Sequence, residues 1–194
     1  MTKVLLTGFE PFGTATTNPS GEIVKQITGE NIVTAILPVA YAQSAERLLA
    51  LIAEHNPDVV ISLGQAEGRT QITPERVAIN LDDARLADNE GVMRNDVKIL
   101  EDGPDAYFST LPIKEIVNAI QAKGIPAAVS LSAGAFLCNH VFYVAQNKFV
   151  GTGVRSGFIH VPLMDSQAPE FPGLPTMPLD QMVTAVRAML ETIS

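Results

Sequence analysis

The stretch VSLSAGAFLCNHVFY, Val129 to Tyr143, reveals more about the fold than any other part of the chain. It begins as an apolar run typical of a buried strand, breaks at Ser132-Ala133-Gly134, and then carries apolar residues at helical spacing. Cys138, the only cysteine among 194 residues, is predicted to lie in the first turn of that helix. Unpaired backbone N–H groups and the positive end of the helix dipole favour a thiolate there and lower the pKa of the thiol. The alternative is that Cys138 is a small core residue, as most isolated cysteines are.

The composition excludes several classes of protein. The chain is 46% hydrophobic and has a net charge of −8, with no cluster of Lys or Arg, which argues against nucleic-acid and anionic-membrane partners. A single cysteine cannot form an internal disulfide. The N-terminal residues lack the apolar length of a signal peptide, and no apolar run approaches the ~18 residues of a membrane helix. We therefore expect a cytoplasmic protein.

Apolar runs alternate with amphipathic patterns along most of the chain. The runs that predict strands are Val4–Phe9, Ile32–Val39, Asp58–Leu63, Ala127–Leu131 and Ser156–Met164. Helices are predicted after Asn18-Pro19, over Tyr41–His55, from Pro112 to Gly124, through the cysteine stretch and from Pro178. This order predicts one domain, residues 1–194, built as a three-layer α/β/α sandwich around a mostly parallel twisted sheet.

Residues 71–110 interrupt the alternation. Arg76–Leu81 has the pattern of a half-buried strand, and the polar run Asp82–Gly91 follows it. Long irregular segments inside compact domains usually belong to a binding site or an assembly surface. We therefore expect a hairpin excursion from the main sheet. The Pro-rich segment of residues 165–176 is a predicted loop, and the apolar residues from Phe171 to Met177 are candidates for an interface.

Cysteine chemistry at neutral pH needs a base within reach and a group that orients the base. His140 is two residues beyond Cys138 on the same helix and faces a different direction. His160 lies in the last strand, which a right-handed crossover places beside the strand that leads to the cysteine. His160 is therefore the candidate base, although a histidine in an apolar strand can equally be a satisfied core residue. Glu75 is the candidate acid, and its alternative is a solvated side chain.

Two glycine-bearing loops, Thr7–Gly13 and Gly64–Arg69, end the first and follow the third predicted strand. They therefore lie at the sheet edge where open α/β folds bind ligands. Neither loop has the glycine spacing of a phosphate-binding motif. Phe9 and Phe12 in the first loop either contact a ligand or pack over the core. No His, Cys, Asp or Glu cluster has metal-ligand spacing, so we expect no metal site.

Four segments together closely resemble the pyroglutamyl peptidase I family, the pyrrolidone-carboxylate cysteine peptidases. They are GFEPFG, GQAEGR with ITPERVAINLDDARLADNEG, SAGAFLCNHVFY, and GFIHVP. The resemblance covers essentially the whole chain, and the segments occur in the order of the family. It implies a phosphorylase/hydrolase-like fold, a homotetramer, and an enzyme that removes N-terminal pyroglutamate from peptides without a cofactor. The implied route is a Cys-His-Glu triad and a thioester acyl-enzyme.

The resemblance also implies roles for individual residues. Cys138 would be the nucleophile, His160 the general base and acid, and Glu75 the group that orients His160. Arg85 and the backbone N–H of Cys138 would stabilise the oxyanion. The residues implied to bind the substrate are Phe9, Phe12 and Phe136, as an apolar slot for the lactam ring, and Gln65, whose amide would hydrogen-bond the lactam.

Departures from the family are confined to a few places. Ala87 stands where the family usually has proline, and the loop before His160 and residues 165–176 match less closely. Two other interpretations use the same fold. The first is a different amidase or a phosphorylase-type enzyme, although Arg69 and Arg85 are the only candidates for a phosphate cradle. The second is a non-catalytic protein that binds a small molecule, in which Cys138 would have ordinary reactivity.

Overall fold

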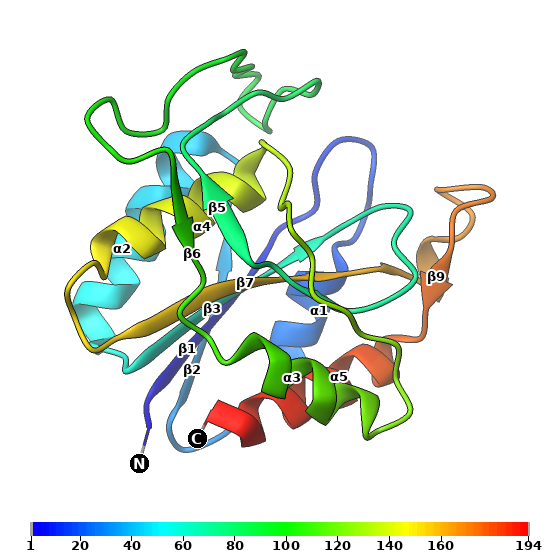
Figure 1. Cartoon of the computed structure of the whole chain (residues 1–194). Coiled ribbons are helices and arrows are strands. Elements are labelled where there is room, and N and C mark those ends of the chain that lie inside the picture. Colours follow the sequence, from blue (N-terminus) through cyan, green and yellow to red (C-terminus); the bar gives the residue numbers. More distant parts are fainter. Residues whose placement is uncertain (1, 194) are drawn as a thin grey trace.

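The central sheet is built from the apolar runs of the chain. The computed structural model describes residues 2–193, and its main sheet has the strand order β2-β1-β3-β7-β4 (Figure 1). Four of the strands are parallel: β1 (Val4–Phe9), β2 (Ile32–Leu37), β3 (Val59–Gln65) and β7 (Arg155–Val161). The short β4 (Thr73–Pro74) joins β7 in the antiparallel direction. β1 and β3 are buried throughout because both faces of the sheet are covered.

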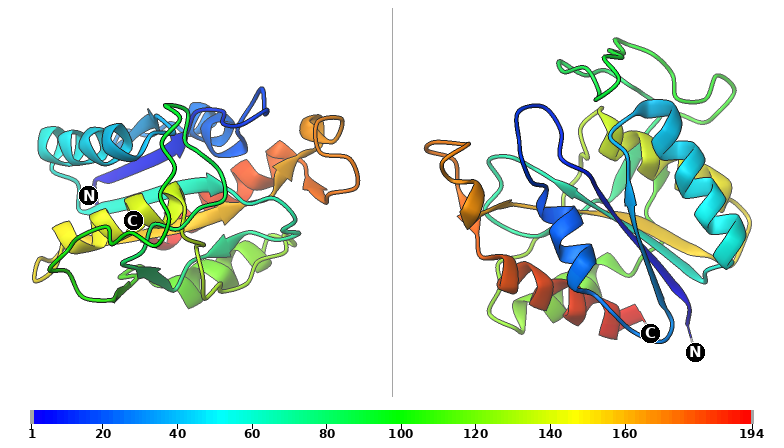
Figure 2. Two further views of the ribbon diagram at one scale, coloured as in Figure 1. Left: turned by 90° about the horizontal axis from the view of Figure 1, so that it is seen from above. Right: turned by 180° about the vertical axis from the view of Figure 1, so that it is seen from behind.

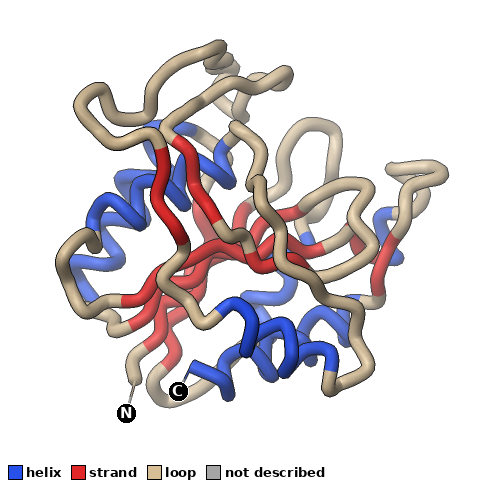
Figure 3. The backbone as a smooth tube through the Cα atoms, viewed as in Figure 1, coloured by secondary structure: helices blue, strands red, loops and turns tan. Residues whose placement is uncertain are grey.

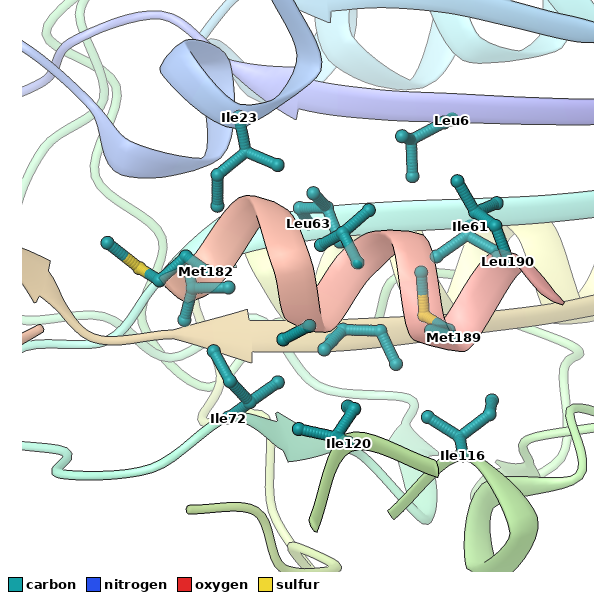
Figure 4. Close-up of a cluster of buried hydrophobic side chains, with 14 of the residues drawn as sticks. Leu6, Ile23, Ile61, Leu63, Ile72, Ile116, Ile120, Met182, Met189 and Leu190 are labelled. Atoms are coloured by element: carbon teal, nitrogen blue, oxygen red, sulfur yellow. The ribbon is translucent and has the colours of Figure 1, made fainter. Parts of the chain in front are cut away.

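Helices cover both faces of the sheet (Figure 2). The helices α1 (Pro19–Gln26), α3 (Ile113–Gln121) and α5 (Leu179–Ile193) pack on one face, and α2 (Tyr41–His55) and α4 (Leu137–Lys148) pack on the other. Figure 4 shows Leu6 and Leu63 of the sheet near Met182 and Met189 of α5, within the first of these two cores. The predicted α/β sandwich with a mostly parallel sheet is confirmed.

The predicted hairpin excursion is also present. β5 (Val77–Ile79) and β6 (Ala106–Phe108) form a separate antiparallel pair. The residues between them are almost entirely loop and project beyond the sheet (Figure 3). Asn139 of α4 holds the base of this loop, because its Nδ2 donates to the carbonyl oxygens of Ile79 and Leu81 at 2.9 and 3.0 Å.

The strand predicted over Ala127–Leu131 is wrong as a member of the main sheet. This segment makes only isolated bridges, between Ala127 and Ile72 and between Ser130 and Glu75. The edge of β7 is already occupied by β4, and the backbone N–H of Glu75 donates to Phe158 O at 2.9 Å. The segment that leads to Cys138 is therefore not next to the strand of His160, and the chain around Glu75 lies between the two.

The last predicted strand, Ser156–Met164, is divided in two. β7 ends at Val161, and β8 (Leu163–Met164) pairs instead with β9 (Thr176–Met177). Pro162 separates them because proline has no N–H to continue a ladder. A short 3₁₀ turn, η1 (Asp165–Gln167), follows β8. Within residues 2–193 none of the helices has the length and apolarity required to cross a membrane.

Candidate active site

Cys138 lies where a helix begins beside the ends of the parallel strands. α4 starts at Leu137, so Cys138 occupies its first turn, as the spacing predicted. The chain enters this helix through Gly134, whose φ of 74° is in the left-handed region that glycine tolerates. No side chain caps the helix at Phe136, so first-turn N–H groups are left for another acceptor.

His160 and Glu75 form a buried pair. His160 Nδ1 lies 2.7 Å from Glu75 Oε1, and the Glu75 side chain is fully buried. This contact fixes the imidazole ring and leaves Nε2 as the nitrogen available to a reacting group. The alternative in which Glu75 is a solvated side chain is therefore wrong, because its backbone pairs with the edge of β7 and its carboxylate is buried against His160.

Arg69 is a third member of this cluster, a place that the sequence did not predict for it. Its Nη1 lies 2.7 Å from Glu75 Oε1, and its Nη2 donates to Ser132 O at 3.0 Å. A second contact of Nη1 is with Thr73 Oγ1. Arg69 thus connects the acid to the turn that precedes Cys138. The need of a buried carboxylate for a counter-charge favours an arginine partner, but it does not choose Arg69 over Arg76, which is adjacent to Glu75 in the sequence.

A cavity of about 300 Å³ joins these groups to the predicted pocket residues. Its lining includes both Cys138 and His160, and the other predicted residues in it are Phe9, Phe12, Phe136 and Gln65. The Phe12 and Phe136 rings lie 6.2 Å apart between centroids and are tilted by 50°. Phenylalanine rings thus form one part of the cavity wall, which suits a small neutral ring, while polar and charged side chains such as Asn18, Glu67 and Arg69 line other parts.

The sulfur of Cys138 packs closely against the end of β3. A Cβ atom at Gly64 would lie 2.8 Å from Cys138 Sγ and 2.7 Å from Phe158 Cζ. Real side chains do not approach so closely, so only glycine leaves room for the sulfur here. Gly64, one of the two glycines of the second loop, therefore makes room for the Cys138 sulfur.

The pKa of Cys138 is shifted opposite to the sequence expectation. The pKa of the thiol is raised to about 12, chiefly by burial and then by the Glu75 charge, while Arg69 and the backbone N–H of Cys138 oppose the rise. The predicted lowering is wrong because burial outweighs the helix start. Burial also lowers the pKa of His160, against the opposing effect of Glu75. Both shifts favour a neutral thiol and a neutral imidazole, and no hydrogen bond joins the two within residues 2–193.

Arg85 is not brought to the cavity. Its side chain is exposed on the excursion loop, and it is not among the residues that line the cavity. Its role at the oxyanion stays a prediction. His140 faces away from the cavity, as expected from its spacing, because its Nδ1 lies 2.9 Å from Asp82 Oδ2.

Known proteins match this chain over its whole length. The model of the pyroglutamyl peptidase family matches residues 2–194. The pyrrolidone-carboxylate peptidase of Cupriavidus pinatubonensis is 48% identical over 200 residues, which cover 99% of this chain and 93% of that protein. The one from Vibrio vulnificus is 48% identical over 197 residues, with 99% and 92% covered.

Solved structures agree with this assignment. The crystal structure of pyroglutamyl peptidase I from Bacillus amyloliquefaciens has a TM-score of 0.95 and 45% identity, with 98% of this chain and 94% of that chain covered. A mutant pyrrolidone carboxyl peptidase from Pyrococcus furiosus has a TM-score of 0.93 and 40% identity, with 98% and 97% covered. The chain therefore belongs to the pyroglutamyl peptidase family of cysteine peptidases.

Proposed function

We propose that this protein removes N-terminal pyroglutamate from peptides, with Cys138 as the nucleophile and His160 and Glu75 completing the triad. One observation carries the proposal: the only cysteine of the chain and a carboxylate-paired histidine line the same aromatic-walled cavity. Membership of the pyroglutamyl peptidase family supports the same substrate.

The cavity suits the substrate ring in size and polarity. The five-membered lactam is flat and neutral, so it can be buried between Phe9, Phe12 and Phe136 without loss of a charge. An ordinary N-terminal residue carries an ammonium group, and its burial against these phenylalanine rings without a hydrogen-bond partner costs on the order of several kcal/mol. The Gln65 amide supplies a hydrogen bond to the lactam, which a prolyl ring without the carbonyl cannot use.

The resting charges define the first chemical step. Because the thiol and the imidazole are both neutral, His160 Nε2 removes the thiol proton as Sγ attacks the carbonyl carbon that follows the lactam ring. The resulting imidazolium is stabilised by Glu75, which lies 2.7 Å from Nδ1. The backbone N–H of Cys138 faces the developing oxyanion. Arg85 joins it in this proposal, which requires its exposed side chain to turn toward the cavity when substrate binds.

Collapse of the intermediate then divides the substrate. The C–N bond breaks, the imidazolium of His160 gives its proton to the departing amine, and pyroglutamate remains on Cys138 as a thioester. Water attacks the thioester while His160 takes a proton from it. The thiol is released with a proton returned from His160, together with free pyroglutamic acid, so no cofactor enters the cycle.

Release of a chromophoric amine tests this proposal. Pyroglutamyl and prolyl conjugates are compared under reducing conditions, with and without prior treatment with iodoacetamide. We expect release from the pyroglutamyl conjugate alone, abolished by alkylation and by Cys138→Ala, because Cys138 is the only thiol. Turnover that survives alkylation would exclude Cys138 as the nucleophile. No release from either conjugate would favour a binding protein on the same fold.

We also propose that residues 1–194 act as one catalytic domain in a cytoplasmic homotetramer. Exposed apolar side chains are the candidates for its contacts, and Phe108 and Leu131 are 71% and 74% exposed. Phe171, in the segment considered for an interface, is half-buried and Met177 is buried, so Leu174 is the better candidate there. Sedimentation of the wild type and of Phe108→Ser tests this; a wild-type monomer mass would contradict it.

A further inference from the structure

We propose that Gln167 fixes the orientation of the Gln65 amide, so that Gln65 presents its Nε2–H group to the lactam carbonyl of the substrate. The inference rests on the proposed function and adds a positioning residue to it. Gln167 lies in η1, inside the predicted loop of residues 165–176, and no role for it was predicted from the sequence. Gln167 is fully buried.

Two backbone groups determine which way the Gln167 amide points. Met164 N–H lies 2.9 Å from one amide atom of Gln167, and because an N–H can only donate, that atom must be the oxygen Oε1. The other amide atom lies 3.1 Å from Thr17 O, and because a carbonyl can only accept, that atom must be Nε2. The orientation of this amide therefore follows from chemistry, since a flipped amide would lose both bonds.

The orientation of Gln167 then determines that of Gln65. Gln167 Nε2 donates to Gln65 Oε1 at 3.0 Å, in a bond buried from solvent. Gln65 Oε1 thus has a donor, and Nε2 occupies the other corner of the same planar amide group. That Nε2 has a long contact of 3.4 Å with Glu67 Oε1, and Gln65 lines the cavity. A donor with only a weak protein partner is therefore available to a ligand.

The chemical class recognised by such a donor is a carbonyl oxygen. A lactam ring carries one, and a prolyl ring of the same size does not. If the Gln65 amide turned over, its oxygen would face the lactam oxygen and also Glu67 Oε1, and these acceptors would lie together without a proton between them. Gln167 prevents this, so it contributes to selection of the lactam ring without touching it.

The same segment also holds the loop that carries Phe12. Glu170 accepts from Thr16 N at 2.9 Å and from Thr16 Oγ1 at 2.7 Å, and Gln167 bonds the neighbouring carbonyl of Thr17. Loss of Gln167 therefore has a structural effect as well as an effect on the Gln65 amide. A test must separate the two.

Gln167→Glu and Gln167→Met separate them. The glutamate can still accept from Met164 N–H, but its second oxygen faces Gln65 Oε1, so the Gln65 amide turns over. We expect KM for the pyroglutamyl conjugate to rise and the affinity for 2-pyrrolidone, the bare lactam, to fall by about tenfold or more, with a smaller change in kcat. Toward acid pH the introduced carboxyl gains a proton and becomes a donor again, so 2-pyrrolidone affinity recovers, as followed by ligand-observed NMR. Gln167→Met has no donor at any pH and should not recover.

Gln146→Met is the matched control. Gln146 is also a buried glutamine, and its Nε2 donates to Ser156 O at 2.7 Å, but it does not line the cavity. This variant should unfold at a lower temperature with KM unchanged. Gln167→Glu with wild-type KM and wild-type 2-pyrrolidone affinity would overturn the inference, as would equal losses in both Gln167 variants at every pH. A wild type that neither cleaves the pyroglutamyl conjugate nor binds 2-pyrrolidone would instead overturn the proposed function.

Discussion

Replacement of Glu75 by glutamine distinguishes a neutral Cys138 thiol from a Cys138 thiolate that is paired with an imidazolium. The Glu75 side chain is fully buried, and Oε1 lies 2.7 Å from both His160 Nδ1 and Arg69 Nη1. Glutamine keeps the shape and removes the negative charge. Because that charge raises the pKa of Cys138 and the Arg69 charge lowers it, Glu75→Gln should make the thiol more acidic.

The resting pKa of Cys138 determines how little thiolate the wild type contains, and the Glu75 charge determines how much the variant gains. A thiol with a pKa of about 12, against an ordinary value of 9.0, has about a thousandfold less thiolate at neutral pH. A unit charge across an imidazole ring, on the order of 8 Å away, contributes ~2 kcal/mol at an effective dielectric constant of ~20. Its removal corresponds to roughly thirtyfold more thiolate at a fixed pH. Turnover should fall nonetheless, because His160 loses the group that orients it.

Alkylation by iodoacetamide as a function of pH measures this directly, since Cys138 is the only thiol in the chain. We expect slow alkylation of the wild type at pH 8 and faster alkylation of Glu75→Gln. Glu115→Gln, which removes an exposed carboxylate on α3, should leave the rate unchanged. If the thiol were instead held as a thiolate beside an imidazolium, loss of Glu75 would slow alkylation. Wild-type alkylation with an apparent pKa below about 7 would also refute our reasoning.

Three further predictions concern neighbouring residues. Gly64→Ala places a Cβ 2.8 Å from Cys138 Sγ, so urea unfolding should show a loss of ~1–3 kcal/mol with a fall in kcat, and unchanged kcat would contradict the packing. Arg69→Gln removes one partner of the buried Glu75 and should cost ~1–3 kcal/mol at pH 8, reduced because Arg69 is partly exposed. That deficit should shrink toward acid pH, because loss of the Arg69 charge removes one cause of the lowered His160 pKa and so favours a protonated His160 beside Glu75; a constant deficit would argue against this. Because the folded-state pKa of His160 is lowered below 6.5, the acid limb of kcat/KM should have its midpoint below that value, and a midpoint near 7 would exclude it.

The parts of the fold that depend on local pattern were predictable. Val4–Phe9 and Tyr41–His55 have the bounds predicted from the sequence, since one is a continuous apolar run and the other a regular apolar stripe. The strand predicted over Ala127–Leu131 is wrong as a member of the main sheet because an apolar run is equally consistent with any buried extended segment. Long-range contacts determine which segment pairs with the edge of β7. That segment is β4, at the start of the excursion of residues 71–110, where the local sequence gives little signal for a strand.

The site was predictable to a similar degree. Cys138, His160 and Glu75 could be proposed because few side chains perform this chemistry and the family pattern contains all three. The shift in thiol pKa could not be predicted, because it depends on how much of the chain surrounds the sulfur. Gln167 was also missed, since its role depends on two backbone groups that are distant from Gln65 in sequence.

The chain contains a second cluster with the same residue types. Asp82 is fully buried, and its Oδ2 lies 2.9 Å from His140 Nδ1 and 2.7 Å from Arg94 Nη1. The Arg94 guanidinium lies over the Tyr41 ring, 4.4 Å from its centroid. This cluster fastens the excursion loop to α4 and α2.

Comparison of the two clusters indicates what makes one of them a candidate for catalysis. In each, a buried carboxylate holds one histidine by Nδ1 and one arginine by a guanidinium nitrogen. His140 is even the closer of the two histidines to Cys138 in sequence. His160 lines the cavity together with the sulfur, whereas none of Asp82, His140 and Arg94 lines it. The carboxylate-histidine-arginine arrangement alone therefore does not specify catalysis, because a base can act only where a thiol and a bound ring can both reach it.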